Sequence, residues 1–102
     1  MYARESSLKE EERKMIKKEV VIINKTGLHA RPASDFVLAA KKFESKITIC
    51  KEGGEAINAK SVVRLLAECI GQGTRVEITA DGTDEEAAMD ELVALIESGF
   101  GE

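Results

Sequence analysis

Short β-branched runs, separated by turn residues and by longer amphipathic segments, constrain the fold of this chain more than any other feature. The runs typical of strands cover residues 19–23, 46–51, 56–59 and 74–80. Helical spacing of apolar residues predicts helices over residues 30–43, from Val62 to about Ala67, and from Thr83 to Gly99. This order, β-α-β-β-α-β-α, predicts an α+β fold. We expect a two-layer open-faced β-sandwich, with three helices on one face of a four-stranded antiparallel sheet.

Residues at the predicted helix ends support these boundaries. Pro32 suits the first turn of the helix over 30–43, because its missing N–H costs nothing there. Ser61 is placed to cap the second helix. Thr83 and Glu86 have the spacing of a capping box, and Gly99 is expected to end the last helix.

The N-terminal part of the chain differs from the rest. Residues 1–14 are highly charged and hold too few apolar residues to bury a face, so we expect a flexible charged extension there. Residues 15–102 are expected to form one domain. Residues 1–18 carry a net charge of +2 while the whole chain carries −4, so the remainder carries −6. That acidic balance argues against direct nucleic-acid binding.

Composition restricts both the core and the kinds of site. Of the residues, 43% are hydrophobic but only 4% aromatic, so the core must be aliphatic. One histidine and two cysteines without CxxC spacing, Cys50 and Cys69, argue against a zinc site, and we expect no cofactor. Two isolated cysteines favour a reduced, cytoplasmic protein, and no apolar run is long enough for membrane insertion.

His29, the only histidine, lies where the first strand leads into the helix over 30–43. The first N–H groups of a helix, here those of Ala30 and Arg31, have no partner and form an anion site. The helix dipole and Arg31 favour a neutral, nucleophilic imidazole. A phosphoryl group on that imidazole would meet the free N–H groups and a guanidinium. From these residues alone, an incidental loop histidine beside a solvated arginine is the alternative.

Ser61 is a second candidate residue with two interpretations. At a helix start it is first of all an N-cap. A phosphate there would gain from the helix dipole but add a charge of about −2. Val62, Val63 and Leu66, which follow it, are either ordinary core residues or the exposed apolar part of a partner-docking surface.

The segments TGLHARPAS and NAKSVVRLL, with the order of elements, resemble the HPr family, the histidine-containing phosphocarrier proteins of the bacterial phosphoenolpyruvate:sugar phosphotransferase system. The resemblance runs from about Lys17 to the C-terminus. It implies that His29 accepts a phosphoryl group on Nδ1 from phosphorylated enzyme I and passes it to IIA domains of sugar permeases. It implies that Arg31 assists both transfers. The chain would then be a monomeric carrier, a reactant in the relay rather than an enzyme.

The resemblance also implies a regulatory role for Ser61. In many Gram-positive relatives, an ATP-dependent HPr kinase phosphorylates the matching serine, which slows transfer through the histidine and creates a corepressor for a catabolite-control transcription factor. Val62, Val63 and Leu66 would contribute to the docking surface. The residues that depart from the usual Gram-positive pattern are Arg64, Ala67, Glu68 and Cys69. The hairpin before Ile57 is also one residue longer.

Three alternative functions stay open. A phosphoserine-dependent binding module for a transcription factor would need Ser61 but not His29. An HPr-like relay could serve nitrogen or dihydroxyacetone metabolism instead of sugar uptake. A small-ligand domain could hold a free anion at the helix start. No GxxxxGK[ST] loop is present, so a phosphoryl group would have to arrive already activated.

Overall fold

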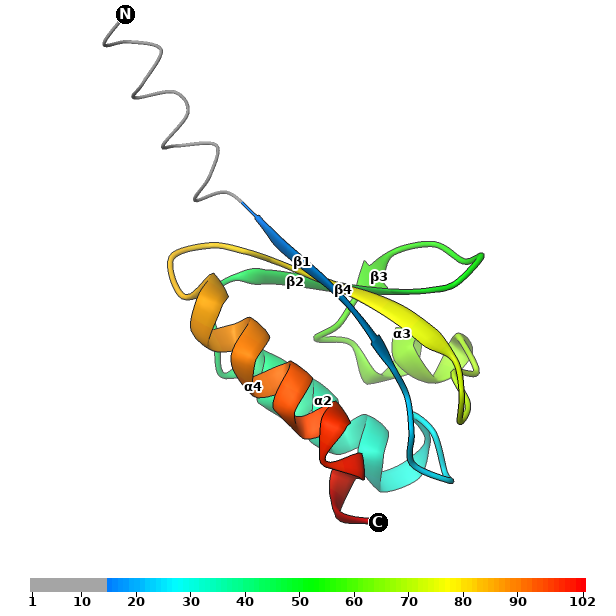
Figure 1. The fold of residues 1–102 in the computed structure, drawn as a ribbon. Coiled ribbons are helices and arrows are strands. Elements are labelled where there is room, and N and C mark those ends of the chain that lie inside the picture. Colours follow the sequence, from blue (N-terminus) through cyan, green and yellow to red (C-terminus); the bar gives the residue numbers. More distant parts are fainter. Residues whose placement is uncertain (1–14) are drawn as a thin grey trace, which may run out of the picture.

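The computed structural model describes residues 15–102, and its four strands form one antiparallel sheet (Figure 1). The strands are β1 (Ile16–Val21), β2 (Lys46–Lys51), β3 (Ile57–Asn58) and β4 (Arg75–Asp81). Their order across the sheet is β1-β4-β2-β3, so the first and last strands of the sequence lie side by side. The predicted extension over residues 1–14 lies outside the described residues.

Three α-helices lie on one face of this sheet. They are α2 (Ala30–Lys41), α3 (Val62–Ala67) and α4 (Glu85–Glu97), followed by a 3-10 turn, η1 (Gly99–Gly101). Figure 1 shows α2 and α4 side by side, while α3 lies near β3. The predicted open-faced sandwich is therefore confirmed. Gly99, with φ of 71°, ends α4 as expected, whereas η1 was not predicted.

The core lies between the sheet and the helices and is mostly aliphatic, in line with the composition. On β4, alternate residues Val76, Ile78 and Ala80 are buried. Phe36 on α2 is the largest fully buried side chain. The residues of α4 that pack against the core follow helical spacing and include Ala88, Leu92 and Ile96.

The element boundaries differ slightly from those predicted. The strand expected over 19–23 begins earlier, at Ile16, because pairing with β4 extends the sheet through two lysines, and it ends earlier, at Val21. The helix expected over 30–43 ends at Lys41, since the next two N–H groups bond to carbonyls three residues back. The bounds of β2 are as predicted, and those of β3 and β4 differ by single residues.

The capping box predicted from Thr83 and Glu86 is wrong. The N-cap of α4 is Asp84, and its side chain makes no bond to the N–H groups of its own helix. Its carboxylate instead accepts hydrogen bonds from the N–H of Glu44 at 2.9 Å, the N–H of Ser45 at 3.0 Å and the Ser45 hydroxyl. Asp84 therefore joins the start of α4 to the loop between α2 and β2.

Candidate functional site

His29 is the N-cap residue of α2, where the loop from β1 enters the helix. Its backbone is extended, with φ of −132° and ψ of 161°. The residue is half-buried. The imidazole does not cap the helix, and within residues 15–102 it forms no ion pair. Neither ring nitrogen is therefore occupied in capping the helix, so capping does not compete with a reaction at the imidazole.

The start of α2 presents two backbone donors beside His29. The first-turn N–H groups of a helix lack helical partners, and Pro32 has no N–H, which leaves those of Ala30 and Arg31. The Arg31 side chain is exposed and forms no ion pair with the described residues. Two N–H groups and a guanidinium thus lie next to the imidazole in sequence, an arrangement suited to an anion.

Ala30 has a left-handed backbone, with φ of 54°. This conformation costs a non-glycine residue about 1 kcal/mol. Such strain persists only where neighbouring structure imposes it, and it is common at functional sites. The strained residue lies directly between His29 and Arg31, so the surrounding structure holds this helix start in an unfavourable backbone conformation.

The loop before His29 is tied to the segment that follows α3. The N–H of Leu28 donates to the Ile70 carbonyl at 2.8 Å. Gly27, with φ of 73°, packs so closely there that a Cβ would lie 2.6 Å from the same oxygen. Glycine is therefore required at this position both by conformation and by space. The position of His29 therefore depends on contacts with the segment that follows α3.

Two residues that sequence reasoning did not single out hold the same loop. Asn24 is buried, and its Nδ2 donates to the Gly27 carbonyl at 3.0 Å. Glu102, 76 residues away in sequence, accepts a hydrogen bond from the Thr26 N–H at 3.2 Å. Hydrogen bonds from the Thr26 side chain and N–H lower the pKa of Glu102 from its ordinary value of 4.5. Asn24 lies in a segment of turn-forming residues, Asn24 to Gly27, whereas no sequence signal pointed to Glu102.

Ser61 caps α3, as predicted. Its Oγ accepts a hydrogen bond from the N–H of Arg64 at 3.2 Å. On α3 only Leu65 is buried. The exposed apolar residues of this helix are Val62, Val63 and Leu66, with 36%, 73% and 40% of their surfaces accessible. These three residues are therefore not core residues. They are called the docking face below, after the role predicted for them from the sequence.

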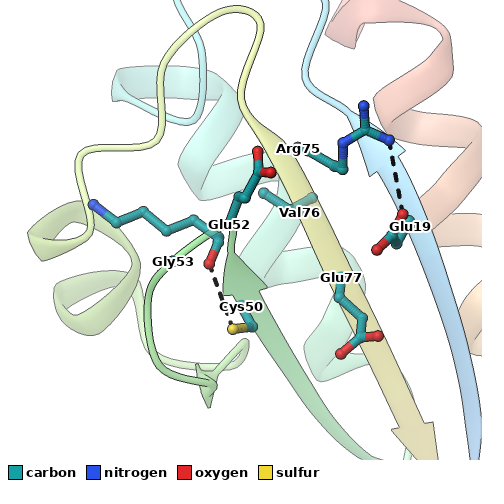
Figure 2. Close-up of a pocket in the computed structure, with 8 residues that line it drawn as sticks. Glu19, Cys50, Glu52, Gly53, Arg75, Val76 and Glu77 are labelled. Carbon is teal, nitrogen blue, oxygen red and sulfur yellow. Dashed lines mark hydrogen bonds and ion pairs between the residues drawn. The ribbon is translucent and has the colours of Figure 1, made fainter.

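A shallow hollow of about 180 Å³ lies on the sheet face opposite the helices (Figure 2). Glu19, Glu77 and Cys50 are direct neighbours across β1, β4 and β2, and Arg75 pairs with Glu19 at 3.8 Å. Small-molecule sites usually enclose at least about 300 Å³, so this hollow is small for a ligand. Among residues 15–102, no group of three acidic, cysteine or histidine side chains is arranged to hold a metal ion.

None of the helices in residues 15–102 is both long and apolar enough to cross a membrane.

The sequence model of the family described as "PTS HPr component phosphorylation site" matches residues 16–98. The chain belongs to the HPr family. It is 49% identical over 82 residues to the phosphocarrier protein HPr of Haemophilus influenzae, an alignment that covers 80% of this chain and 95% of that protein. It is 45% identical over 83 residues to the HPr-like protein Crh of Halalkalibacterium halodurans, covering 81% of this chain and 98% of the relative.

Solved HPr structures have the same fold. The crystal structure of HPr-C-His from Thermoanaerobacter tengcongensis superposes with a TM-score of 0.82 at 47% identity, covering 85% of this chain and 97% of that one. The resemblance inferred from TGLHARPAS and NAKSVVRLL is thus confirmed, and the chain is a member of a family of phosphocarrier proteins of the phosphotransferase system.

Proposed function

We propose that His29 accepts a phosphoryl group from phosphorylated enzyme I and passes it to the IIA domains of sugar permeases. The observation that carries this proposal is the position of His29, the one histidine of the chain, at the N-cap of α2. Its imidazole makes no capping bond and adjoins the free N–H groups of Ala30 and Arg31. Membership of the HPr family supports phosphoryl transfer as the use of this arrangement.

The proposed chemistry is a pair of displacements at phosphorus. The Nδ1 lone pair of His29 attacks the phosphoryl group on enzyme I, forming a P–N bond while the bond to the donor breaks and its electron pair returns to the donor. A nucleophile of the IIA domain then attacks, and the P–Nδ1 bond breaks in the same way. Charge on the phosphoryl oxygens is stabilised by the N–H groups of Ala30 and Arg31 and by the Arg31 guanidinium.

Intact-mass analysis after incubation with phosphoenolpyruvate and enzyme I tests this proposal. The unmodified chain should gain one acid-labile phosphate, which a IIA domain then removes. His29→Ala should gain none, whereas Ser61→Ala should be labelled normally. Uptake of the label by His29→Ala would refute the assignment of the phosphoryl acceptor. A label that no sugar-permease IIA domain removes would favour a relay to another pathway.

We propose Ser61 as a separate, regulatory phosphorylation site for an HPr kinase. Its hydroxyl lies at the start of α3, beside the docking face, and similarity to the HPr-like protein Crh supports a regulatory variant. A phosphate there adds about −2 charge next to an apolar surface, which should weaken docking for transfer. The phosphorylated form would bind a catabolite-control transcription factor.

The test of this regulatory role uses ATP and HPr kinase in place of enzyme I. An acid-stable phosphate should appear on the unmodified chain and on His29→Ala, and it should be absent from Ser61→Ala. Phosphorylation should slow labelling of His29 by phosphorylated enzyme I. A chain that gains no phosphate from ATP would restrict Ser61 to capping α3.

We infer that the carrier acts as a cytoplasmic monomer, because it must present the same surface to enzyme I and to IIA domains in turn. Sedimentation velocity should give a single species of 11.1 kDa. A stable dimer that buries the start of α2 would contradict this inference.

A further inference from the structure

Helix α3 has few attachments to the rest of the molecule. It spans six residues, Val62–Ala67, and buries one side chain, Leu65. A helix this short does not persist in water by itself, so its position depends on what holds it. Ser61 satisfies a backbone N–H at its N-terminus. The carbonyl groups at its C-terminus need partners as well.

Lys51, the last residue of β2, supplies one of these partners. Its Nζ donates a hydrogen bond to the carbonyl oxygen of Glu68 at 2.7 Å, joining residues 17 apart in sequence. Glu68 is the C-cap residue of α3, where the exposed carbonyls and the helix dipole favour a cation. Lys51 is half-buried, so this charged hydrogen bond is partly shielded from water.

The hairpin that follows β2 leaves space for the Lys51 side chain to reach α3. The Gly54 N–H donates to the Lys51 carbonyl at 2.8 Å, and a Cβ on Gly54 would lie 2.9 Å from Cγ of Lys51. The absence of a side chain at Gly54 therefore leaves room for the lysine stem. Gly53, in the loop that leaves the end of β2 beyond Cys50 (Figure 2), has open space around it.

The end of α3 that Lys51 holds leads directly to the His29 loop. After Glu68 the chain reverses at Cys69, which has φ of 55°. The carbonyl of the next residue, Ile70, accepts the hydrogen bond from Leu28, the residue before His29. A shift of the C-terminal end of α3 would therefore displace both Leu66 and the loop that leads into His29.

We propose that Lys51 is a positioning residue that holds the docking face of α3 in register with His29. The proposal rests on the proposed function, because register between the two matters only if partners dock on α3 while phosphoryl transfer occurs at His29. The lysine acts through the backbone of α3, to which its Nζ donates at Glu68.

The first test replaces the charged donor and keeps the aliphatic stem. Lys51→Met should increase amide hydrogen exchange of residues 65–70 by about tenfold, the usual effect of losing a charged hydrogen bond. It should raise the KM for the carrier in transfer from phosphorylated enzyme I by roughly three- to tenfold, with kcat unchanged. Lys51→Arg should restore both values. Lys46→Met, at the other end of β2, should alter neither.

A second pair of variants reaches the same contact without changing charge. Gly54→Ala should displace the lysine stem and reproduce the exchange and KM changes of Lys51→Met. Gly53→Ala, which strains the turn but leaves the stem in place, should not increase exchange in α3. The proposal is overturned if Lys51→Met matches Lys46→Met in both measurements. If the unmodified chain takes no label from phosphorylated enzyme I, the proposed function fails instead, while hydrogen exchange still judges the lysine contact.

Discussion

Arg31 offers an exposed guanidinium beside His29 that forms no ion pair within residues 15–102. Its planar donors match the oxygens of a phosphoryl group. We expect Arg31→Ala to slow transfer from phosphorylated enzyme I by about a hundredfold, the usual effect of removing one transition-state donor. The Tm should stay the same because the side chain is exposed. Rapid-quench kinetics measure the rate, with Lys17→Ala on β1 as the charge-matched control, and equal rates for the two variants would remove Arg31 from the mechanism.

Cys69, like Ala30, is a non-glycine residue with a left-handed backbone. Its φ of 55° follows the C-cap of α3, a position where many helices place glycine, and its side chain is exposed. Cys69→Gly should therefore raise the free energy of unfolding by about 1 kcal/mol. Ala67→Gly, at a regular helical position, should lower it by a similar amount, about 1 kcal/mol. Urea unfolding monitored by circular dichroism distinguishes these outcomes, and a destabilised Cys69→Gly would contradict the assigned strain.

At the scale of elements, Asp84 fastens α4 to the loop between α2 and β2. Its carboxylate receives hydrogen bonds from Glu44 and from Ser45, which is 1% exposed. Asp84→Asn keeps the size of the side chain but replaces the charged acceptor, so the buried Ser45 groups are less well satisfied. We expect a Tm several degrees lower in a thermal melt. Asp90→Asn, on the exposed side of α4, should melt like the unmodified chain.

At the scale of the whole molecule, two carboxylates link segments that are distant in sequence and make stability depend on pH. The hydrogen bond from the Ser45 side chain, followed by that from the Glu44 N–H, lowers the pKa of Asp84 from 3.8. Thr26 lowers the pKa of Glu102 from 4.5 in the same way. A carboxyl group whose folded pKa is lowered stabilises the fold fully above its unfolded pKa. That contribution is lost as pH falls through the folded pKa.

The expected consequence is a loss of stability below about pH 4.5, where these carboxylates begin to be protonated in the unfolded chain. Urea midpoints measured at pH 6 and at pH 3.5 should differ for the unmodified chain. The difference should shrink in the double variant Asp84→Asn, Glu102→Gln. An identical pH dependence in that variant would show that other groups govern acid unfolding.

The sequence by itself determined the order of the elements, the aliphatic core and the residues at the start of α2. These depend on signals that are local along the chain: alternation in β4, helical spacing in α4, and a contiguous run from Gly27 to Pro32. The Ser61 cap of α3 could be predicted for the same reason, since donor and acceptor lie three residues apart. His29 needed no tertiary information to be singled out.

Only the tertiary structure decided how these elements are joined. It placed β1 beside β4, and it brought Asp84 at the start of α4 to Ser45, Glu102 to Thr26 and Lys51 to the end of α3. The last three contacts connect residues 39, 76 and 17 positions apart. No periodic or capping signal records such pairs, because each depends on which backbone groups remain without partners once the sheet and helices have packed.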